Sequence, residues 1–73
     1  MIEIKLKYMM SEYSKRVGKK LTYKVLAEET GIAKATIESI GSRPDYNATL
    51  DTIDKLCGYL RCSVEELLEY RKG

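Results

Sequence analysis

The chain has 73 residues, of which 33% are charged, and a formal net charge of +2, which fits one soluble globular domain and leaves no length for a second. It contains no histidine, so the commonest general base and metal ligand of enzymes is missing. No apolar run has the length of a membrane span, and the first residues lack the pattern of a secretion signal. We therefore expect a cytoplasmic protein without a membrane segment that is not an enzyme and carries no cofactor and no metal.

Two cysteines, Cys57 and Cys62, are the only thiols. A structural zinc site normally takes four ligands, which two thiols without histidine do not supply. The two thiols could form a disulfide in principle, but without a secretion signal we expect them to be reduced. Cys57 falls on a helical apolar stripe and is expected in the core, whereas Cys62 falls in a turn and is expected to be more accessible.

The charges are distributed unevenly along the chain. Residues 1–43 hold nine basic and five acidic side chains, and residues 44–73 hold four basic and six acidic ones. A basic half joined to an acidic half is typical of a protein that meets a polyanion with one face. Simple solvation of surplus lysines remains the alternative explanation of this pattern.

The first half of the chain predicts an extended segment and two helices. Residues 1–4 alternate apolar and charged side chains, as a strand does. Apolar side chains then recur every three or four positions and predict a helix over residues 5–17, which Gly18 ends. Thr22 is the predicted N-terminal cap of the second helix, and Gly31 its predicted end.

The second half predicts three more helices. In the third, Ile37 and Ile40 face inward, and residues 41–45, which include the only proline, predict a loop. Thr49 is the predicted cap of a fourth helix that begins near Leu50. The expected apolar stripe of this helix comprises Ile53, Leu56, Cys57 and Leu60.

The C-terminal stretch begins with a capping box, in which a serine is followed three residues later by a glutamate. Ser63 and Glu66 form this pattern and predict a fifth helix with Leu67 and Leu68 inside. Leu68 and Tyr70 then alternate as the first residues do, so the two ends of the chain could pair. The predicted fold is an all-α, compact five-helix domain over residues 1–73, with short extended termini as an option.

Residues 22–42 carry the spacing of two helices joined by a tight turn. Ala27 lies four residues before Gly31, and Ile37 lies six residues after it. Two helices that cross at about 90–120° need a small side chain where they touch, and glycine allows the positive φ of the turn. The outer face of the second of these helices is then free to enter the major groove of DNA. That face is expected to present Ala35, Glu38, Ser39 and Ser42, flanked by Lys34 and Thr36.

The stretch LTYKVLAEETGIAKATI (residues 21–37) resembles the helix-turn-helix core of the Cro/cI-type (XRE family) regulators, and TLDTIDKLCGYLRCSVEELLEY (residues 49–70) resembles the helices that follow it in a small branch of that family. The resemblance covers about residues 5–70. It implies a lambda-repressor-like domain that binds double-stranded DNA as a small transcriptional regulator. A repressor that acts by operator occupancy, as a homodimer on a two-fold site, is the expected form.

The resemblance also implies which residues contact DNA. Base contacts are expected from four residues of the recognition helix, namely Lys34, Ala35, Thr36 and Ser39. Contacts to the phosphate backbone are expected from Thr22, Tyr23, Lys24, Arg43 and Asn47. For Tyr23, packing against the protein surface is an equally open interpretation. Ala35 replaces the hydrogen-bonding side chain that many relatives carry, but its methyl group can contact a thymine methyl.

A protein-interaction module is the alternative to a DNA-binding regulator. The same fold can bind a partner protein, as an antitoxin or a co-regulator does. The acidic cluster Glu65, Glu66 and Glu69 would serve such a role. Absence of DNA affinity at low salt, together with a co-purifying protein, would favour this alternative.

Overall fold

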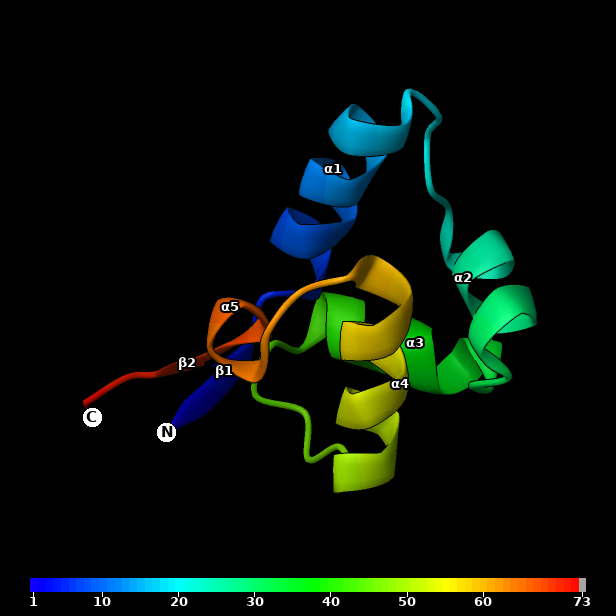
Figure 1. Cartoon of the computed structure of the whole chain (residues 1–73). Helices are drawn as coiled ribbons and strands as arrows, with labels where there is room; N and C mark the ends of the chain where they lie inside the picture. Colours follow the sequence, from blue (N-terminus) through cyan, green and yellow to red (C-terminus); the bar gives the residue numbers. More distant parts are fainter. Residues whose placement is uncertain (73) are drawn as a thin grey trace.

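The computed structural model describes residues 1–72 and contains five helices and two short strands in that range (Figure 1). The predicted five-helix fold is confirmed, and the extended termini form a small sheet. In chain order the elements are β1 (Ile2–Ile4), α1 (Leu6–Val17), α2 (Tyr23–Thr30), α3 (Lys34–Ser42), α4 (Leu50–Leu60), α5 (Val64–Leu67) and β2 (Leu68–Tyr70).

Three helices begin at the caps that the sequence predicts. Thr22, Thr49 and Ser63 precede α2, α4 and α5, and each side-chain oxygen accepts a hydrogen bond of 3.2 Å from the backbone N–H three residues on. At α5 the Glu66 carboxylate also accepts a 2.8 Å hydrogen bond from the backbone N–H of Ser63. The hydrogen bonds from Ser63 lower the pKa of Glu66, so the complete capping box is present at neutral pH.

Three helices end in the left-handed conformation. Gly18 and Gly31, at φ +72° and +77°, end α1 and α2 as predicted. Arg61, which the sequence did not single out, ends α4 at φ +54°, where a non-glycine residue costs about 1–2 kcal/mol. Arg16 of α1 compensates part of this cost, because its guanidinium donates a 2.7 Å hydrogen bond to the Leu60 carbonyl in the last turn of α4.

Two predicted boundaries were wrong. Gly41 and Ser42 belong to α3, and the loop begins at Arg43, whose φ of −131° is extended. Pro44 restricts only the residue directly before it, so the helix continues to Ser42. Leu68 was predicted inside the fifth helix, but it starts β2, because pairing with β1 replaces the helical hydrogen bonds there.

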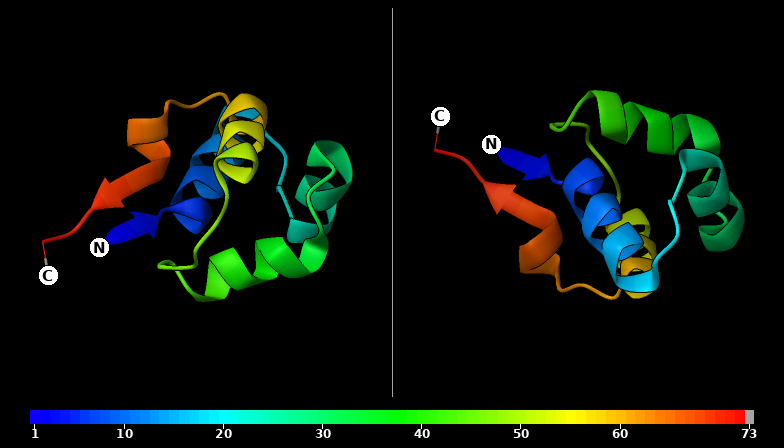
Figure 2. Two further views of the ribbon diagram at one scale, coloured as in Figure 1. Left: turned by 90° about the horizontal axis from the view of Figure 1, so that it is seen from below. Right: turned by 90° about the horizontal axis from the view of Figure 1, so that it is seen from above.

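The two ends of the chain pair as an antiparallel sheet. Ile2 lies opposite Tyr70 and Ile4 opposite Leu68, which confirms the pairing that the alternation suggested. The N–H of Ile4 donates a 2.7 Å hydrogen bond to the Pro44 carbonyl, which ties the sheet to the loop after α3. The sheet lies at the end of the molecule opposite α2 in each of the views (Figures 1 and 2).

One hydrophobic core joins all five helices. The fully buried side chains are Leu6, Leu26, Ile37, Ile40, Leu56, Leu60 and Leu67. The rings of Tyr13 and Tyr59, 5.3 Å apart, close the contact between α1 and α4. Helix α3 lies on one side of the molecule and α5 on the other (Figure 2). None of the helices in residues 1–72 is long and apolar enough to cross a membrane.

Candidate nucleic-acid interface

Helices α2 and α3 are joined by a tight, internally hydrogen-bonded turn. The Gly31 N–H donates a 2.9 Å hydrogen bond to the Ala27 carbonyl, and half-buried Ala27 packs against the core. The Thr30 hydroxyl donates to the Leu26 carbonyl at 2.6 Å and accepts from the Ile32 N–H at 3.2 Å. The turn confirms the left-handed glycine predicted at Gly31, and it adds Thr30, whose side chain bridges α2 to the start of the turn.

Helix α3 has an apolar inner face and a polar outer face, as the sequence predicts. Ile37 and Ile40 are buried at 0% and 1% exposure. The other side chains are small or polar. On the outer face Ala35, Glu38 and Ser42 are exposed and Ser39 is half-buried, and on its flanks Lys34 is exposed and Thr36 is half-buried. The four candidates for base contact therefore lie on one helix, and the small side chains among them let the α3 backbone approach a groove closely.

The charges on α3 nearly cancel in the free protein. The Lys34 ammonium lies 4.0 Å from the Glu38 carboxylate, and both side chains are more than half exposed. An exposed pair of this kind contributes at most about 1 kcal/mol, so DNA can displace it at little cost. Glu38 is the only carboxylate in α3, and a carboxylate on a recognition surface can accept a hydrogen bond from a cytosine amino group.

The start of α2 lies against the last turn of α3. Lys24 is exposed, and the Thr22 hydroxyl oxygen is engaged as the cap. Tyr23 is half-buried and packs against the core. A Cβ atom at Gly41 would lie 2.7 Å from the Tyr23 Cζ and closer still to the hydroxyl oxygen, so the ring occupies the space that the missing side chain leaves. The packing interpretation of Tyr23 therefore holds, with its hydroxyl at the junction of α2 and α3.

Gly41→Ala is expected to change stability with opposite sign in two backgrounds. In the wild type the added methyl group displaces the Tyr23 ring, and such overpacking costs about 1–2 kcal/mol. After Tyr23→Ala the space is empty, so Gly41→Ala should stabilise by about 0.5–1 kcal/mol through reduced backbone entropy of the unfolded chain. A double-mutant cycle from urea unfolding measures the difference. The same sign in both backgrounds would contradict the assigned contact.

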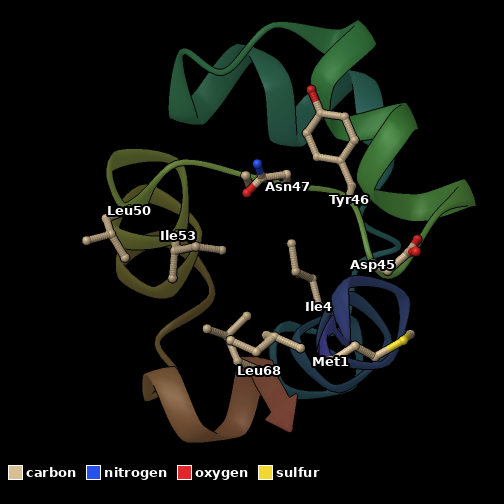
Figure 3. A pocket seen from close by; sticks show the side chains of 10 residues that line it. Met1, Ile4, Asp45, Tyr46, Asn47, Leu50, Ile53 and Leu68 are labelled. Atoms are coloured by element: carbon tan, nitrogen blue, oxygen red, sulfur yellow. The ribbon is translucent and has the colours of Figure 1, made fainter. Parts of the chain in front are cut away.

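Arg43 and Asn47, the two remaining residues predicted to contact the DNA phosphate backbone, lie in different surroundings. Arg43 follows α3 directly, and its guanidinium lies 5.8 Å from the centre of the Tyr46 ring, next to the recognition helix. Asn47 lies further along the loop and lines a depression of about 430 Å³ with residues of β1, α4 and β2, among them Ile4 and Leu50 (Figure 3). The structure thus brings Arg43 together with α3 and places Asn47 beside the sheet.

Cys57 and Cys62 are half-buried neighbours with free thiols. The Cys62 N–H donates a 3.1 Å hydrogen bond to the Cys57 carbonyl. Cys62 is less exposed than its predicted position in a turn suggested, and Cys57 is less buried than its predicted position in the core suggested. Within the described part of the chain no three histidine, cysteine or acidic side chains cluster as metal ligands do. Burial raises the pKa of Cys57, and it raises that of Cys62 to about 11.

The raised pKa of Cys62 predicts slow alkylation. At pH 7 its thiolate fraction is about 10⁻⁴, against about 3% for an ordinary thiol. Iodoacetamide should therefore modify Cys62 of the folded protein on the order of 300-fold more slowly than it modifies free cysteine. The rate should rise with pH up to about 11. Mass spectrometry of timed samples measures the rate, with the urea-unfolded protein as control. Equal rates in the folded and unfolded protein at pH 7 would contradict the prediction.

The comparisons with known proteins agree with this geometry. A family model described as the Cro/C1-type helix-turn-helix DNA-binding domain matches residues 5–73. The match contains both helices of the turn, the loop after α3 and the helices that complete the core. No curated protein matches the chain closely.

Proposed function

Because the chain belongs to the Cro/C1-type helix-turn-helix DNA-binding domains, we propose that it is a sequence-specific transcriptional repressor that occupies its operator. Its proposed site of action is the cytoplasm, where it would meet the DNA that it regulates. The observation that carries the proposal is the outer face of α3, on which small and polar side chains stand opposite the buried Ile37 and Ile40. A helix of this kind fits the major groove, which carries the base-specific donor and acceptor pattern.

The residue roles follow from position on the two helices. Lys34, Thr36 and Ser39 contact base edges through hydrogen bonds, and Ala35 contacts them through its methyl group. Thr22 and Lys24, at the positive end of the α2 dipole, contact one backbone segment, together with the Tyr23 hydroxyl. Arg43, directly after α3, contacts another. Asn47 lies further along the loop, beside the sheet, and would contact the DNA backbone from that position.

The proposed binding form is a homodimer on a two-fold operator. Helix α3 has nine residues, so at 1.5 Å per residue it is only about 13 Å long. One such helix contacts few base pairs, and each base pair adds only about 1–3 kcal/mol of selectivity. Two copies on half-sites about 34 Å apart double the number of base pairs that are read.

Fluorescence anisotropy of a labelled duplex at several salt concentrations tests the proposal first. A steep fall of log affinity with log salt is expected, because each neutralised phosphate contributes about 0.9 to the slope. Selection from a random pool should then yield a palindromic site. No binding even at about 50 mM salt, where phosphate contacts are strong, would favour the protein-interaction alternative, and a pull-down would follow.

Lys34→Ala separates base contact from phosphate contact. If Lys34 reads a base, the loss should be about 1–3 kcal/mol and should relax the preference at one position of the selected site. If Lys34 contacts a phosphate instead, affinity should fall equally on all sequences, and the salt slope should decrease by about one. Wild-type affinity on the selected site would refute the assignment of α3 as the recognition helix.

A further inference from the structure

A second basic surface lies beside the α2–α3 pair, in a hollow between α1 and the segment that leads into α2. The hollow has a volume of about 330 Å³. Its lining residues are Lys7, Met10, Ser11, Ser14, Lys20, Leu21 and Tyr23. Met10 is buried, whereas Lys7, Ser11 and Lys20 are exposed, so an apolar floor carries a polar rim with two ammonium groups.

The backbone fixes the two sides of this hollow relative to each other. The Leu21 N–H donates a 2.9 Å hydrogen bond to the Ser14 side-chain oxygen, which holds the segment after α1 against that helix. Lys7, Ser11 and Ser14 are spaced by four and three residues and therefore share one flank of α1. Lys20, next to Leu21, is thereby held on the opposite side of the same hollow.

The positive charge of the hollow is not compensated. Among residues 1–72, no carboxylate lies within 4.0 Å of the ammonium group of Lys7 or of Lys20, whereas Lys15, Lys34 and Lys55 each have such a partner. Four other lysines in this range also lack such a partner, but Lys7 and Lys20 are the two that line this hollow. Two like charges at one hollow repel each other, and a bound anion relieves that repulsion. The site is therefore suited to an anion that brings its own negative charge and accepts hydrogen bonds.

The hollow is continuous with the proposed DNA surface. Tyr23 lines it and at the same time lies against Gly41 of α3. Lys7 also lines a neighbouring, smaller hollow with Ile40 and Gly41. Helix α1 packs against α3, and α3 lies on the side of the molecule away from α5 in both views of Figure 2. The anion site thus adjoins the end of α3 and the start of α2.

We propose that this hollow binds one phosphate of the DNA backbone beside the groove that α3 enters, with Lys7 and Lys20 as its cations and the Ser11 and Tyr23 hydroxyls as donors. This inference rests on the proposed DNA binding and extends the interface from the helix-turn-helix to α1. The family resemblance assigned neither lysine to DNA, because their proximity arises from the packing of α1 on the segment before α2.

The test compares two double variants on the selected duplex. Lys7→Ala/Lys20→Ala removes both cations of the hollow, and Lys55→Ala/Lys72→Ala removes the same charge from α4 and from the tail. Strand β2, which precedes Lys72, lies on the side opposite α2 (Figure 1). The Lys7→Ala/Lys20→Ala dimer loses one phosphate contact per subunit, which should lower the salt slope by about 0.9 per subunit, or about 1.8 in total, and the affinity about eightfold per subunit at 0.1 M salt. The control should keep the wild-type slope. Thermal unfolding verifies that both variants are folded.

Duplexes with a single uncharged methylphosphonate locate the contact. Wild-type protein should lose affinity at every phosphate that it contacts. Lys7→Ala/Lys20→Ala should be insensitive to the substitution at one of these positions in each half-site and should keep the wild-type sensitivity at the others. An unchanged salt slope for this variant, an equal loss in the control, or equal sensitivity of variant and wild type at every position would overturn the inference while leaving DNA binding intact. A wild-type protein without salt-dependent DNA binding would overturn both proposals.

Discussion

Leu26→Ala is expected to lower the free energy of unfolding by about 2–5 kcal/mol. Leu26 is fully buried in α2, and α2 packs against both α3 and α4. Truncation leaves a cavity where these three helices meet. A domain of this size has a total stability of roughly 4–11 kcal/mol, so the variant should be partly unfolded near physiological temperature. Urea unfolding followed by circular dichroism measures the loss.

Val25→Ala is the matched control for this prediction. Val25 precedes Leu26 in the same helix, but its side chain is 39% exposed, and alanine favours the helix by up to about 0.7 kcal/mol. The control should therefore change stability by less than about 0.5 kcal/mol. A Leu26→Ala variant within that same range would show that α2 is not anchored through its inner face.

The caps and turns of this protein were predictable because their causes are local. Each cap side chain accepts a hydrogen bond from a backbone N–H three residues on, as Thr22, Thr49 and Ser63 do. Gly31 adopts a positive φ because glycine has no Cβ atom to oppose it. Each of these features depends on a few neighbouring residues, which the sequence shows directly. The inward face of α3 was predictable for a similar reason, since the spacing of Ile37 and Ile40 follows from the helical repeat.

The features that were missed depend on residues far apart in the chain. Gly41 was placed in a loop because glycine before a proline usually marks one. Its actual role is to make room for Tyr23, 18 positions earlier, and no local pattern records that contact. Arg61 gives no sequence signal for a left-handed residue. Its position is stabilised by Arg16, which reaches the Leu60 carbonyl from another helix.

The candidate site also combines a feature that is predictable from one segment with a feature that depends on residues far apart in the chain. The outer face of α3 could be derived from one helix, and the structure confirms the predicted exposure of Ala35, Glu38 and Ser42, whereas Ser39 is half-buried. The hollow with Lys7 and Lys20 could not, because one lysine lies in α1 and the other in the segment before α2. Tertiary packing decides which lysines of the basic half line one hollow together.

Ala35→Glu is expected to weaken DNA binding about 100-fold or more, equivalent to ~2.7 kcal/mol, without loss of stability. Ala35 is exposed on the outer face of α3, where Glu38 already places one carboxylate. A second carboxylate there replaces a methyl contact with repulsion from the phosphates that line the groove. Anisotropy titration on the selected duplex measures the loss.

The Ala35→Glu variant should lose DNA affinity but keep its stability, because position 35 lies in the first turn of α3. A negative charge there interacts favourably with the helix dipole by about 0.3–1 kcal/mol, which offsets the lower helix propensity of glutamate. Val64→Glu is the matched control, since it adds the same charge at an exposed first-turn position of α5, on the side of the molecule away from α3 (Figure 2). The control should bind within about threefold of the wild type, a margin of ~0.7 kcal/mol. If both glutamates weakened binding equally, net charge alone would explain the effect, and the outer face of α3 would lose its role as the surface that meets DNA.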